Sequence, residues 1–386
     1  MAADDPAAPD DPLTLPDLAS RAMRGSVIAA SDEFFAEKEN LIKPGAATYS
    51  PHTFGHKGQV YDGWETRRRR GPGPGSGSGS GFGSGFGSGF GLPGADEHDW
   101  VIVRLGAAGV VHAVVVDTAH FTGNFPQSCS VEACFVAGYP DRAALEAARW
   151  AEIVPRSPLK GDTPHVFEVP PGRRFSHVRL RIYPDGGVAR LRVHGAVVPD
   201  PSLLEGLTFD LAALENGGDV VACSDRFYSA PRNAISPGLS RVMGEGWETR
   251  RRRAAGNEWL AVRFAGQALV SLVEVDTSGY IGNSPGMAEV RGHTGGGPDG
   301  GKAGAADAVG PGDDGGWDDP ASWAPLLPRT ALRPDTPHRF RVAPAACELA
   351  RLDVLPDGGV ARLRLYGSLT DLGLAQVRER WAQTAL

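Results

Sequence analysis

Short runs that alternate apolar with polar residues recur along the chain and predict β-strands. Residues 100–105 and 110–117 are rich in Val and Ile, and 177–183 alternates apolar with basic side chains, as a half-buried strand does. The sequence Asp185-Gly186-Gly187 supplies a tight turn before a second alternating run at 188–194. We therefore expect these last two runs to form a β-hairpin.

Helical patterns are few and lie in two places. Residues 142–151 read as one helix, and residues 371–385 as another, because Leu374, Val377 and Trp381 recur there at helical spacing. Strand patterns account for most of the remaining regular segments. The chain is therefore expected to belong to the all-β class, with short helices and a helix at its C-terminal end.

Two long motifs occur twice, in the same order. Gly-Trp-Glu-Thr-Arg-Arg-Arg-Arg at 63–70 returns at 246–253, and Pro-Asp-Gly-Gly-Val-Ala-Arg-Leu-Arg at 184–192 returns at 356–364. The period is much longer than the 20–50 residues of a solenoid repeat, so each copy is a domain. The repeats and the strand patterns together predict two tandem β-sandwiches.

The repeat borders divide the 386-residue chain. We expect a disordered leader at 1–14, a first sandwich at 15–198, a linker at 199–208, a second sandwich at 209–370 and a C-terminal helix at 371–386. Two insertions interrupt the copies, a Gly/Ser/Phe tract at 71–94 and a Gly/Asp-rich stretch at 295–316. Both are expected to be flexible surface loops, with the regularly spaced phenylalanines leaving a docking segment as an alternative.

Composition and charge narrow the functional classes. The net charge of −7 disfavours a dedicated nucleic-acid binder, which usually has a basic face. The four cysteines contain no Cys-x-x-Cys pair, which disfavours a disulfide framework or a zinc ribbon. No apolar stretch is long enough to span a bilayer, and the acidic start does not resemble a signal peptide. A cytoplasmic protein without membrane or nucleic-acid partners is expected.

Four contiguous blocks resemble the allantoicase (allantoate amidinohydrolase) family, and the resemblance covers nearly the whole chain. The blocks are Asp-Glu-Phe-Phe-Ala-Glu-Lys-Glu-Asn-Leu-Ile at 32–42, Tyr-Asp-Gly-Trp-Glu-Thr-Arg at 61–67, Asp-Thr-Ala-His-Phe-Thr-Gly-Asn at 117–124 and Tyr-Pro-Asp-Gly-Gly at 183–187. The resemblance implies two tandem jelly-roll domains of the galactose-binding type. It also implies hydrolysis of allantoate to ureidoglycolate and urea, a step of allantoin and purine degradation.

The resemblance further implies a small-molecule substrate, and we expect a homo-oligomer. Two alternatives stay open at this point: a non-catalytic double sandwich that binds a ligand, and an inactive allantoicase-like protein. Fold alone does not distinguish them, because function depends on the site.

Allantoate sets clear demands on a site, since it carries one carboxylate and two ureido groups on a single carbon. The site needs a cation, amide-type partners and an acid/base pair. Polar residues present only in the first copy are the better catalytic candidates, because both copies must keep residues that hold the fold. His120, which faces Gly279, is the leading acid/base candidate, with a structural histidine as the alternative. Lys43, which faces Ser236, is a candidate for substrate binding.

Other candidates have counterparts in the second copy. Asn124 could bind a ureido group, but Asn283 repeats it, and a turn-forming role is the alternative. Glu132 is a weaker candidate for a catalytic carboxylate, with Glu289 expected as its counterpart. Arg67 is chosen from the first arginine run as a ligand for the substrate carboxylate.

The arginine run also has a structural interpretation, because both copies hold the whole block. An ion pair between Glu65 and a neighbouring arginine is one such role. No cofactor is predicted, since no tight His/Asp/Glu cluster has metal-ligand spacing. A divalent metal held by distant residues, such as His120 and a carboxylate, stays open.

Overall fold

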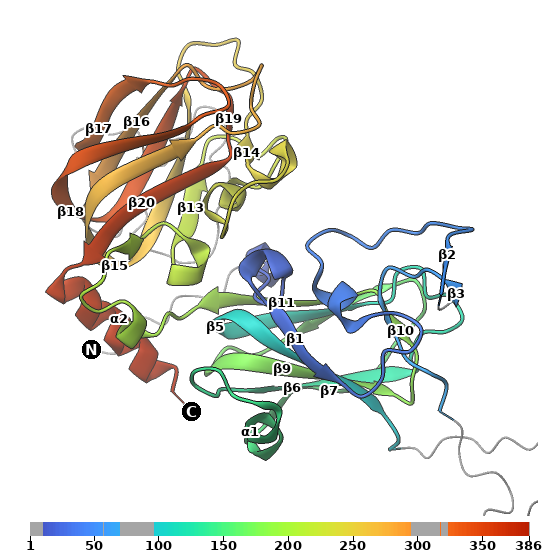
Figure 1. Cartoon of the computed structure of the whole chain (residues 1–386). Coiled ribbons are helices and arrows are strands. Elements are labelled where there is room, and N and C mark those ends of the chain that lie inside the picture. The colour runs from blue at the N-terminus through green and yellow to red at the C-terminus, as the bar shows by residue number, and fades with distance from the viewer. Residues whose placement is uncertain (1–10, 57, 70–95, 295–316, 318–322, 386) are drawn as a thin grey trace, which may run out of the picture.

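The structure is a computed structural model that describes residues 11–56, 58–69, 96–294, 317 and 323–385. It contains two β-sandwiches in chain order, joined by a short connection (Figure 1). The expected flexible loops at 71–94 and 295–316 lie outside the described residues, as does most of the expected leader.

The first sandwich contains the strands β1 (Ser26–Ala30), β2 (Phe54–Gly55), β3 (Gly58–Gln59), β4 (Trp64–Glu65), β5 (Asp99–Asp117), β6 (Ser128–Cys134), β7 (Ala151–Pro158), β8 (Pro164–Glu168), β9 (Arg174–Tyr183), β10 (Gly187–Val188) and β11 (Arg190–Val197). The second contains β12 (Phe209–Asp210), β13 (Asp219–Cys223), β14 (Trp247–Glu248), β15 (Glu258–Asp276), β16 (Met287–His293), β17 (Ala324–Ala331), β18 (Pro337–Leu355), β19 (Gly359–Val360) and β20 (Arg362–Leu369). The α-helices are α1 (Arg142–Ala147) and α2 (Asp371–Gln383). Short 3-10 helices are η1 (Pro12–Thr14), η2 (Arg21–Met23), η3 (Lys38–Ile42), η4 (Pro201–Leu203), η5 (Leu214–Asn216), η6 (Pro231–Ile235) and η7 (Met243–Glu245).

One long strand, β5, belongs to both layers of the first sandwich. Its first half pairs with β1 and β9, and β9 continues to β6 and β7. Its second half pairs with β8 and β11 in the other layer. The two strands expected at 100–105 and 110–117 are therefore a single strand of 19 residues. Alternation of apolar side chains continues along it, because each half has one face toward the common core.

The second sandwich repeats this architecture around β15, which is also 19 residues long. Its halves pair with β13 on one side and β20 on the other, and both halves pair with β18. In the first sandwich the place of β18 is shared by two strands, β8 and β9. The duplication seen in the sequence is thus a duplication of topology.

The expected hairpin between 177–183 and 188–194 is wrong. Strand β9 pairs with β5 and β6, whereas β11 pairs with β5 in the opposite layer. The residues of the turn bond to distant segments instead of to each other: the Gly187 amide donates to Asn124 O and the Ala189 amide to Asp117 O, each at 2.7 Å. Alternation predicts a strand correctly but does not identify the strand's partner.

The expected helix at 142–151 is shorter than predicted. Helix α1 ends at Ala147, and residues from Ala151 onward form β7, which extends the sheet beside β6. The C-terminal helix is confirmed as α2 over Asp371–Gln383. Val377 of this helix is buried beside Ala265 and Leu204.

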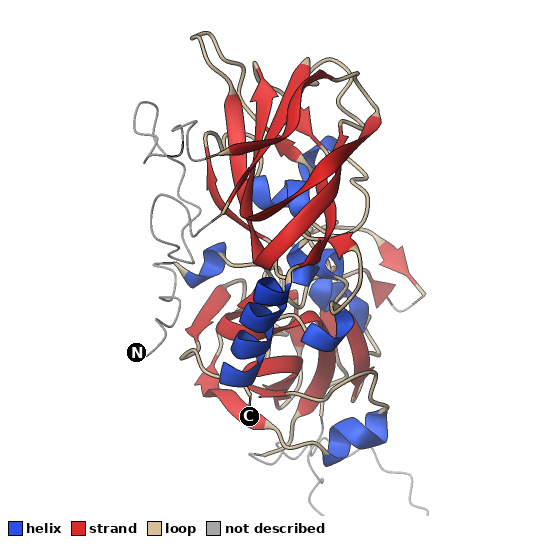
Figure 2. Ribbon diagram, turned by 90° about the vertical axis from the view of Figure 1, so that its left-hand side faces the viewer, coloured by secondary structure: helices blue, strands red, loops and turns tan. Residues whose placement is uncertain are grey.

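Helix α2 belongs to the second sandwich in sequence but also contacts the first (Figure 2). The Arg174 guanidinium, from β9, lies 3.6 Å from the centroid of the Trp381 ring. The Arg174 amide donates to Thr384 O at 3.0 Å. A cation–π contact and a backbone bond therefore join the end of the helix to the first sandwich.

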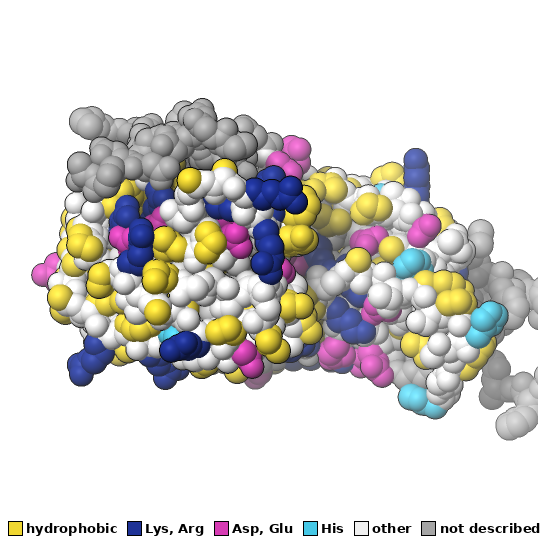
Figure 3. Space-filling model, turned by 90° about the horizontal axis from the view of Figure 1, so that it is seen from above, with side chains coloured by type: hydrophobic (Ala, Val, Ile, Leu, Met, Phe, Trp, Pro, Cys, Tyr) yellow, Lys and Arg dark blue, Asp and Glu magenta, His cyan; other side chains and the backbone are white. Residues whose placement is uncertain are grey.

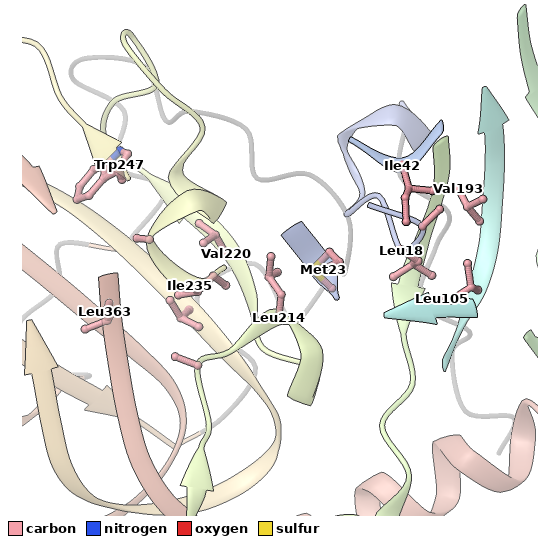
Figure 4. Packing of buried hydrophobic residues seen from close by; sticks show 14 of the residues in the cluster. Leu18, Met23, Ile42, Leu105, Val193, Leu214, Val220, Ile235, Trp247 and Leu363 are labelled. Atoms are coloured by element: carbon pink, nitrogen blue, oxygen red, sulfur yellow. The ribbon is translucent and has the colours of Figure 1, made fainter. Parts of the chain in front are cut away.

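The cores of the two sandwiches meet in one apolar cluster. Met23 of the first sandwich and Leu214 of the second lie at the junction (Figure 4). All four cysteines are buried and free. None of the helices in the described ranges is long and apolar enough to cross a membrane.

One buried histidine gives the first sandwich a measurable response to acid. His177 is fully buried in β9, and burial, followed by the nearby charge of Arg104, lowers its pKa to about 4. Between pH 6.5 and 4 the unfolded chain gains a proton that the folded chain refuses, so stability falls as pH falls through this window. The second repeat has Leu349 at the equivalent register position.

We therefore expect His177→Leu to flatten the acid dependence of stability. The wild type should lose roughly 2–3 kcal/mol more than the variant between pH 7 and 4. Urea denaturation of both proteins at several pH values checks this. Parallel curves would show that His177 is not the group responsible.

Candidate functional site

The two long repeated motifs pair with each other at one end of each sandwich. Strand β4 pairs with β10 in the first copy, and β14 pairs with β19 in the second. This arrangement brings the arginine run next to the Pro-Asp-Gly-Gly turn. The Asp185 carboxylate accepts from Arg68 Nη1 at 3.0 Å and from the Arg69 amide at 2.5 Å.

Carboxylates bond the described arginines of the first run, Arg67, Arg68 and Arg69. Asp32 accepts from the Arg67 amide at 2.9 Å and from Arg67 Nε at 2.8 Å. Arg69 Nη2 lies 2.6 Å from Asp99. In the second copy Arg250 bonds Asp225 through its amide and its side chain. Arg252 bonds Asp357 through its amide and Glu258 through its side chain. A structural role for the run is therefore confirmed, but its partners are these carboxylates.

Glu65 has a different partner from the arginine that the sequence suggested. Its Oε1 atom accepts from Asn124 Nδ2 at 2.6 Å, a bond that Glu248 and Asn283 repeat at 2.5 Å. Burial raises the pKa of Glu65, and the hydrogen bond from Asn124 and the charge of Arg68 offset part of this effect. The balance leaves the pKa of Glu65 above its usual value.

A loop that is longer in the first copy than in the second covers this end of the first sandwich. Pro44 and Gly63 enclose 18 residues, whereas Pro237 and Gly246 enclose eight. We call residues 45–62 the first-repeat loop. It includes strands β2 and β3. Histidine side chains lie on the surface of the first sandwich, at the right of the view in Figure 3. His56, in this loop, is exposed.

Arg190 anchors the first-repeat loop to the sandwich. Its side chain is 2 % exposed and donates to the carbonyls of Gly45 and Asp62 at 3.0 and 2.8 Å. It also bonds the Asp62 carboxylate at 2.7 Å. Burial opposes ionisation of Asp62, but the bonds from Arg190 and Lys43 hold the pKa of this carboxyl well below its usual range. Lys43 Nζ lies 2.8 Å from Asp62, so Lys43 stands at the rim of the loop.

The loop also surrounds His120. The ring of Tyr49 stacks on His120 with 5.6 Å between the ring centroids. The His120 Nε2 atom lies 3.2 Å from Ala47 O. Because a carbonyl can only accept, this contact places the proton of neutral His120 on Nε2 and leaves a lone pair on Nδ1.

The backbone of His120 is unusual for a residue with a side chain. Its φ of 68° lies in the left-handed region, and the equivalent Gly279 has a φ of 82°. Both amides donate to an equivalent aspartate at 2.8 Å, Asp162 in the first copy and Asp335 in the second. The first copy therefore has an imidazole where glycine is the residue without strain.

An open pocket lies beside Arg67. It has a volume of about 570 Å³ and is lined by Asp32, Glu33, Phe34, His56 and Arg67. The Arg67 guanidinium lies 5.4 Å from the centroid of the Phe34 ring, and its side chain is 66 % exposed. A carboxylate ligand can approach this arginine while Asp32 holds its other edge.

Comparison with known proteins identifies the family. The family model described as allantoicase repeat matches residues 16–198 and 209–370. The chain belongs to the allantoicase family. A probable allantoicase of Nocardia farcinica is 48% identical over 368 residues, which cover 95% of this chain and 98% of that protein.

Two further relatives carry the same family name. An allantoicase of Dictyostelium discoideum is 37% identical, covering 95% of this chain and 90% of its own. The crystal structure of a Saccharomyces cerevisiae allantoicase has a TM-score of 0.68 and 29% identity, and the match covers 92% of this chain and 93% of that one. The expected resemblance, the hydrolase class and the fold of two tandem jelly-roll sandwiches are thus confirmed.

Within this allantoicase fold, four of the five candidate residues lie at one end of the first sandwich. His120 contacts the first-repeat loop at Ala47, and Lys43 contacts it at Asp62. Asn124 bonds Glu65 of β4, and Arg67 lies two residues beyond the end of that strand. The structure does not bring Glu132 to them. Its carboxylate pairs with two arginines of β9, Arg179 at 2.6 Å and Arg181 at 3.0 Å.

The counterpart expected for Glu132 is wrong. Glu132 pairs in register with Arg179, and the residue in the same position of the second sandwich is Arg291, opposite Arg351. Glu289 therefore corresponds to Ser130. Residue type does not identify the equivalent positions, because the strand register fixes them.

Sequence reasoning missed three polar residues of this site: Tyr49, Gln59 and Tyr61. All belong to the first-repeat loop, and the ten-residue difference in spacing between the copies would have revealed them. For Glu65 the sequence predicts only an ion pair with an arginine. Across the described part of the chain, no three His, Cys, Asp or Glu side chains come together as a group that could hold a metal ion.

Proposed function

We propose that this chain hydrolyses allantoate to ureidoglycolate and urea at the loop end of its first sandwich. The observation that carries the location is the difference between the copies. His120 occupies a left-handed backbone position that the second copy gives to Gly279. The first-repeat loop, which is ten residues longer than the equivalent segment of the second copy, stacks a tyrosine on that imidazole.

The groups of the substrate can be assigned to side chains at this end of the sandwich. Arg67 offers a guanidinium to the substrate carboxylate in the open pocket. Asn124 donates its amide to Glu65 and keeps its carbonyl oxygen for a ureido N–H. Lys43 adds positive charge at the rim of the same region. Arg67, Asn124 and Lys43 are thus proposed to bind the substrate.

His120 and Glu65 supply the acid/base pair. His120 Nδ1 removes a proton from the N–H of one ureido group, and the electron pair forms a C=N bond to the central carbon. The other ureido group leaves as urea, taking its proton from the Glu65 carboxyl. Water then adds to that carbon, giving its proton to Glu65 while the protonated His120 returns a proton to nitrogen. Both side chains end in their starting states.

A coupled assay of urea release tests this function, run on purified protein before and after exhaustive chelation. Urea release that survives chelation supports the side-chain chemistry described above. Activity that is lost on chelation and restored by a divalent ion keeps allantoate as substrate but overturns a mechanism by side chains alone. No urea under any condition would overturn the enzyme and leave a ligand-binding double sandwich.

We further propose that the protein acts in the cytoplasm, in purine degradation, as a homo-oligomer. Four buried free thiols suit a reducing compartment. Large apolar side chains are exposed around one end of the second sandwich, which suits contact with another copy. They are Phe227, Leu239, Val242 and Ile281. Cell fractionation and light scattering after size exclusion test these two assignments.

A further inference from the structure

The two repeats differ in the tyrosine that lies near the asparagine-bonded glutamate, which is Glu65 in the first repeat and Glu248 in the second. In the second repeat Tyr280 is fully buried, and its hydroxyl donates to Met243 O at 2.6 Å. Burial, and then the charge of Glu248, raises the pKa of Tyr280. This hydroxyl has its partner inside the protein and is closed to a ligand.

In the first repeat the equivalent position is Phe121, which has no hydroxyl. The ring position itself is kept, since a Cβ on either Gly187 or Gly359 would lie about 2 Å from the aromatic ring above it. In the first repeat a phenol comes instead from a residue of the first-repeat loop. Tyr61 stacks on Phe121 with 5.5 Å between centroids and 27° between the ring planes.

The Tyr61 hydroxyl is held more loosely than that of Tyr280. Its contact with Gln59 Oε1 is 3.5 Å long, at the limit of a hydrogen bond. Tyr61 is half-buried. Burial raises the pKa of Tyr61, which therefore stays a neutral O–H donor at neutral pH.

We propose that Tyr61 is a further catalytic residue of the first sandwich, and that its hydroxyl donates a hydrogen bond to the carbonyl oxygen of the departing ureido group. Charge builds on that oxygen as the C–N bond breaks, so a hydroxyl that is free to donate to it stabilises the transition state more than the bound substrate. This assignment rests on the proposed function. It also selects a ureido group over a guanidino group, which offers no carbonyl acceptor.

The test is Tyr61→Phe, which removes one oxygen and keeps the stacked ring. We expect kcat for allantoate to fall on the order of a hundredfold, with KM and the melting temperature nearly unchanged. Tyr280→Phe in the second repeat is the matched control. It removes a buried hydrogen bond, so its melting temperature should fall while kcat stays at the wild-type value.

The outcomes separate this assignment from the function on which it rests. Urea release by the wild type together with wild-type kinetics in Tyr61→Phe would overturn the role of Tyr61 and leave the proposed function intact. A rise in KM with unchanged kcat would overturn the transition-state role, because it would show equal binding in both states. If the wild type releases no urea, the proposed function itself fails, and the role of Tyr61 fails with it.

Discussion

Replacing His120 with glycine is expected to lower turnover of allantoate at least a hundredfold and to leave the fold intact. The imidazole supplies the proposed base, and loss of a positioned acid or base costs about a hundredfold or more. Glycine is the residue that the second repeat has at this backbone position, with a φ of 82°. Relief of the left-handed strain offsets the lost contacts with Tyr49 and Ala47, so stability should stay within about 1 kcal/mol of wild type.

Steady-state kinetics and thermal unfolding of His120→Gly check both parts of this result. The matched control is Gly279→His, which adds strain at the equivalent position of the second sandwich. It should lower the melting temperature and leave turnover unchanged. Near-wild-type turnover in His120→Gly would remove this histidine from the mechanism.

Replacing Arg190 with lysine is expected to lower both stability and turnover. One ammonium cannot reproduce the planar fork that meets Gly45, the Asp62 carbonyl and the Asp62 carboxylate together. Losing part of a buried, charged network costs about 3–5 kcal/mol. The first-repeat loop would lose its anchor, and Tyr49 and Tyr61 would no longer be held over the site.

Arg362→Lys in the second repeat separates these two effects. Arg362 is buried in the same way, and its guanidinium meets the carbonyls of Gly238, Asn233 and Glu245. This variant should lose similar stability in denaturation experiments and keep its turnover at temperatures where it is folded. Equal loss of turnover in both variants would show that the site needs the second sandwich as much as the first.

The sequence predicts the strands and the duplication well because both depend on local pattern. Alternation identifies β9 and β11, and helical spacing identifies α2. The partners of the strands were not predictable in the same way. Strand β11 lies in the other layer from β9, and that choice depends on long-range bonds such as the one from the Gly187 amide to Asn124 O.

The candidate site was predictable only as far as the repeats could be aligned. The opposition of His120 to Gly279 is visible in the sequence because the alignment is unambiguous there. Tyr49 and Tyr61 have no counterpart to be compared with, so an argument from differences at aligned positions passes over them. Residue type alone suggests Glu132, whereas its ion pairs with Arg179 and Arg181 depend on strand register, which is not visible in the sequence.

Because β5 belongs to both layers, it also affects how the first sandwich unfolds. Its first half pairs with β1 and β9, and its second half pairs with β8 and β11. One layer cannot separate from the other unless this strand leaves both. Partly opened forms, which would expose unpaired strand edges to other chains, are therefore disfavoured relative to complete unfolding. The same 19-residue strand that joins the layers thus protects the protein against edge-to-edge aggregation.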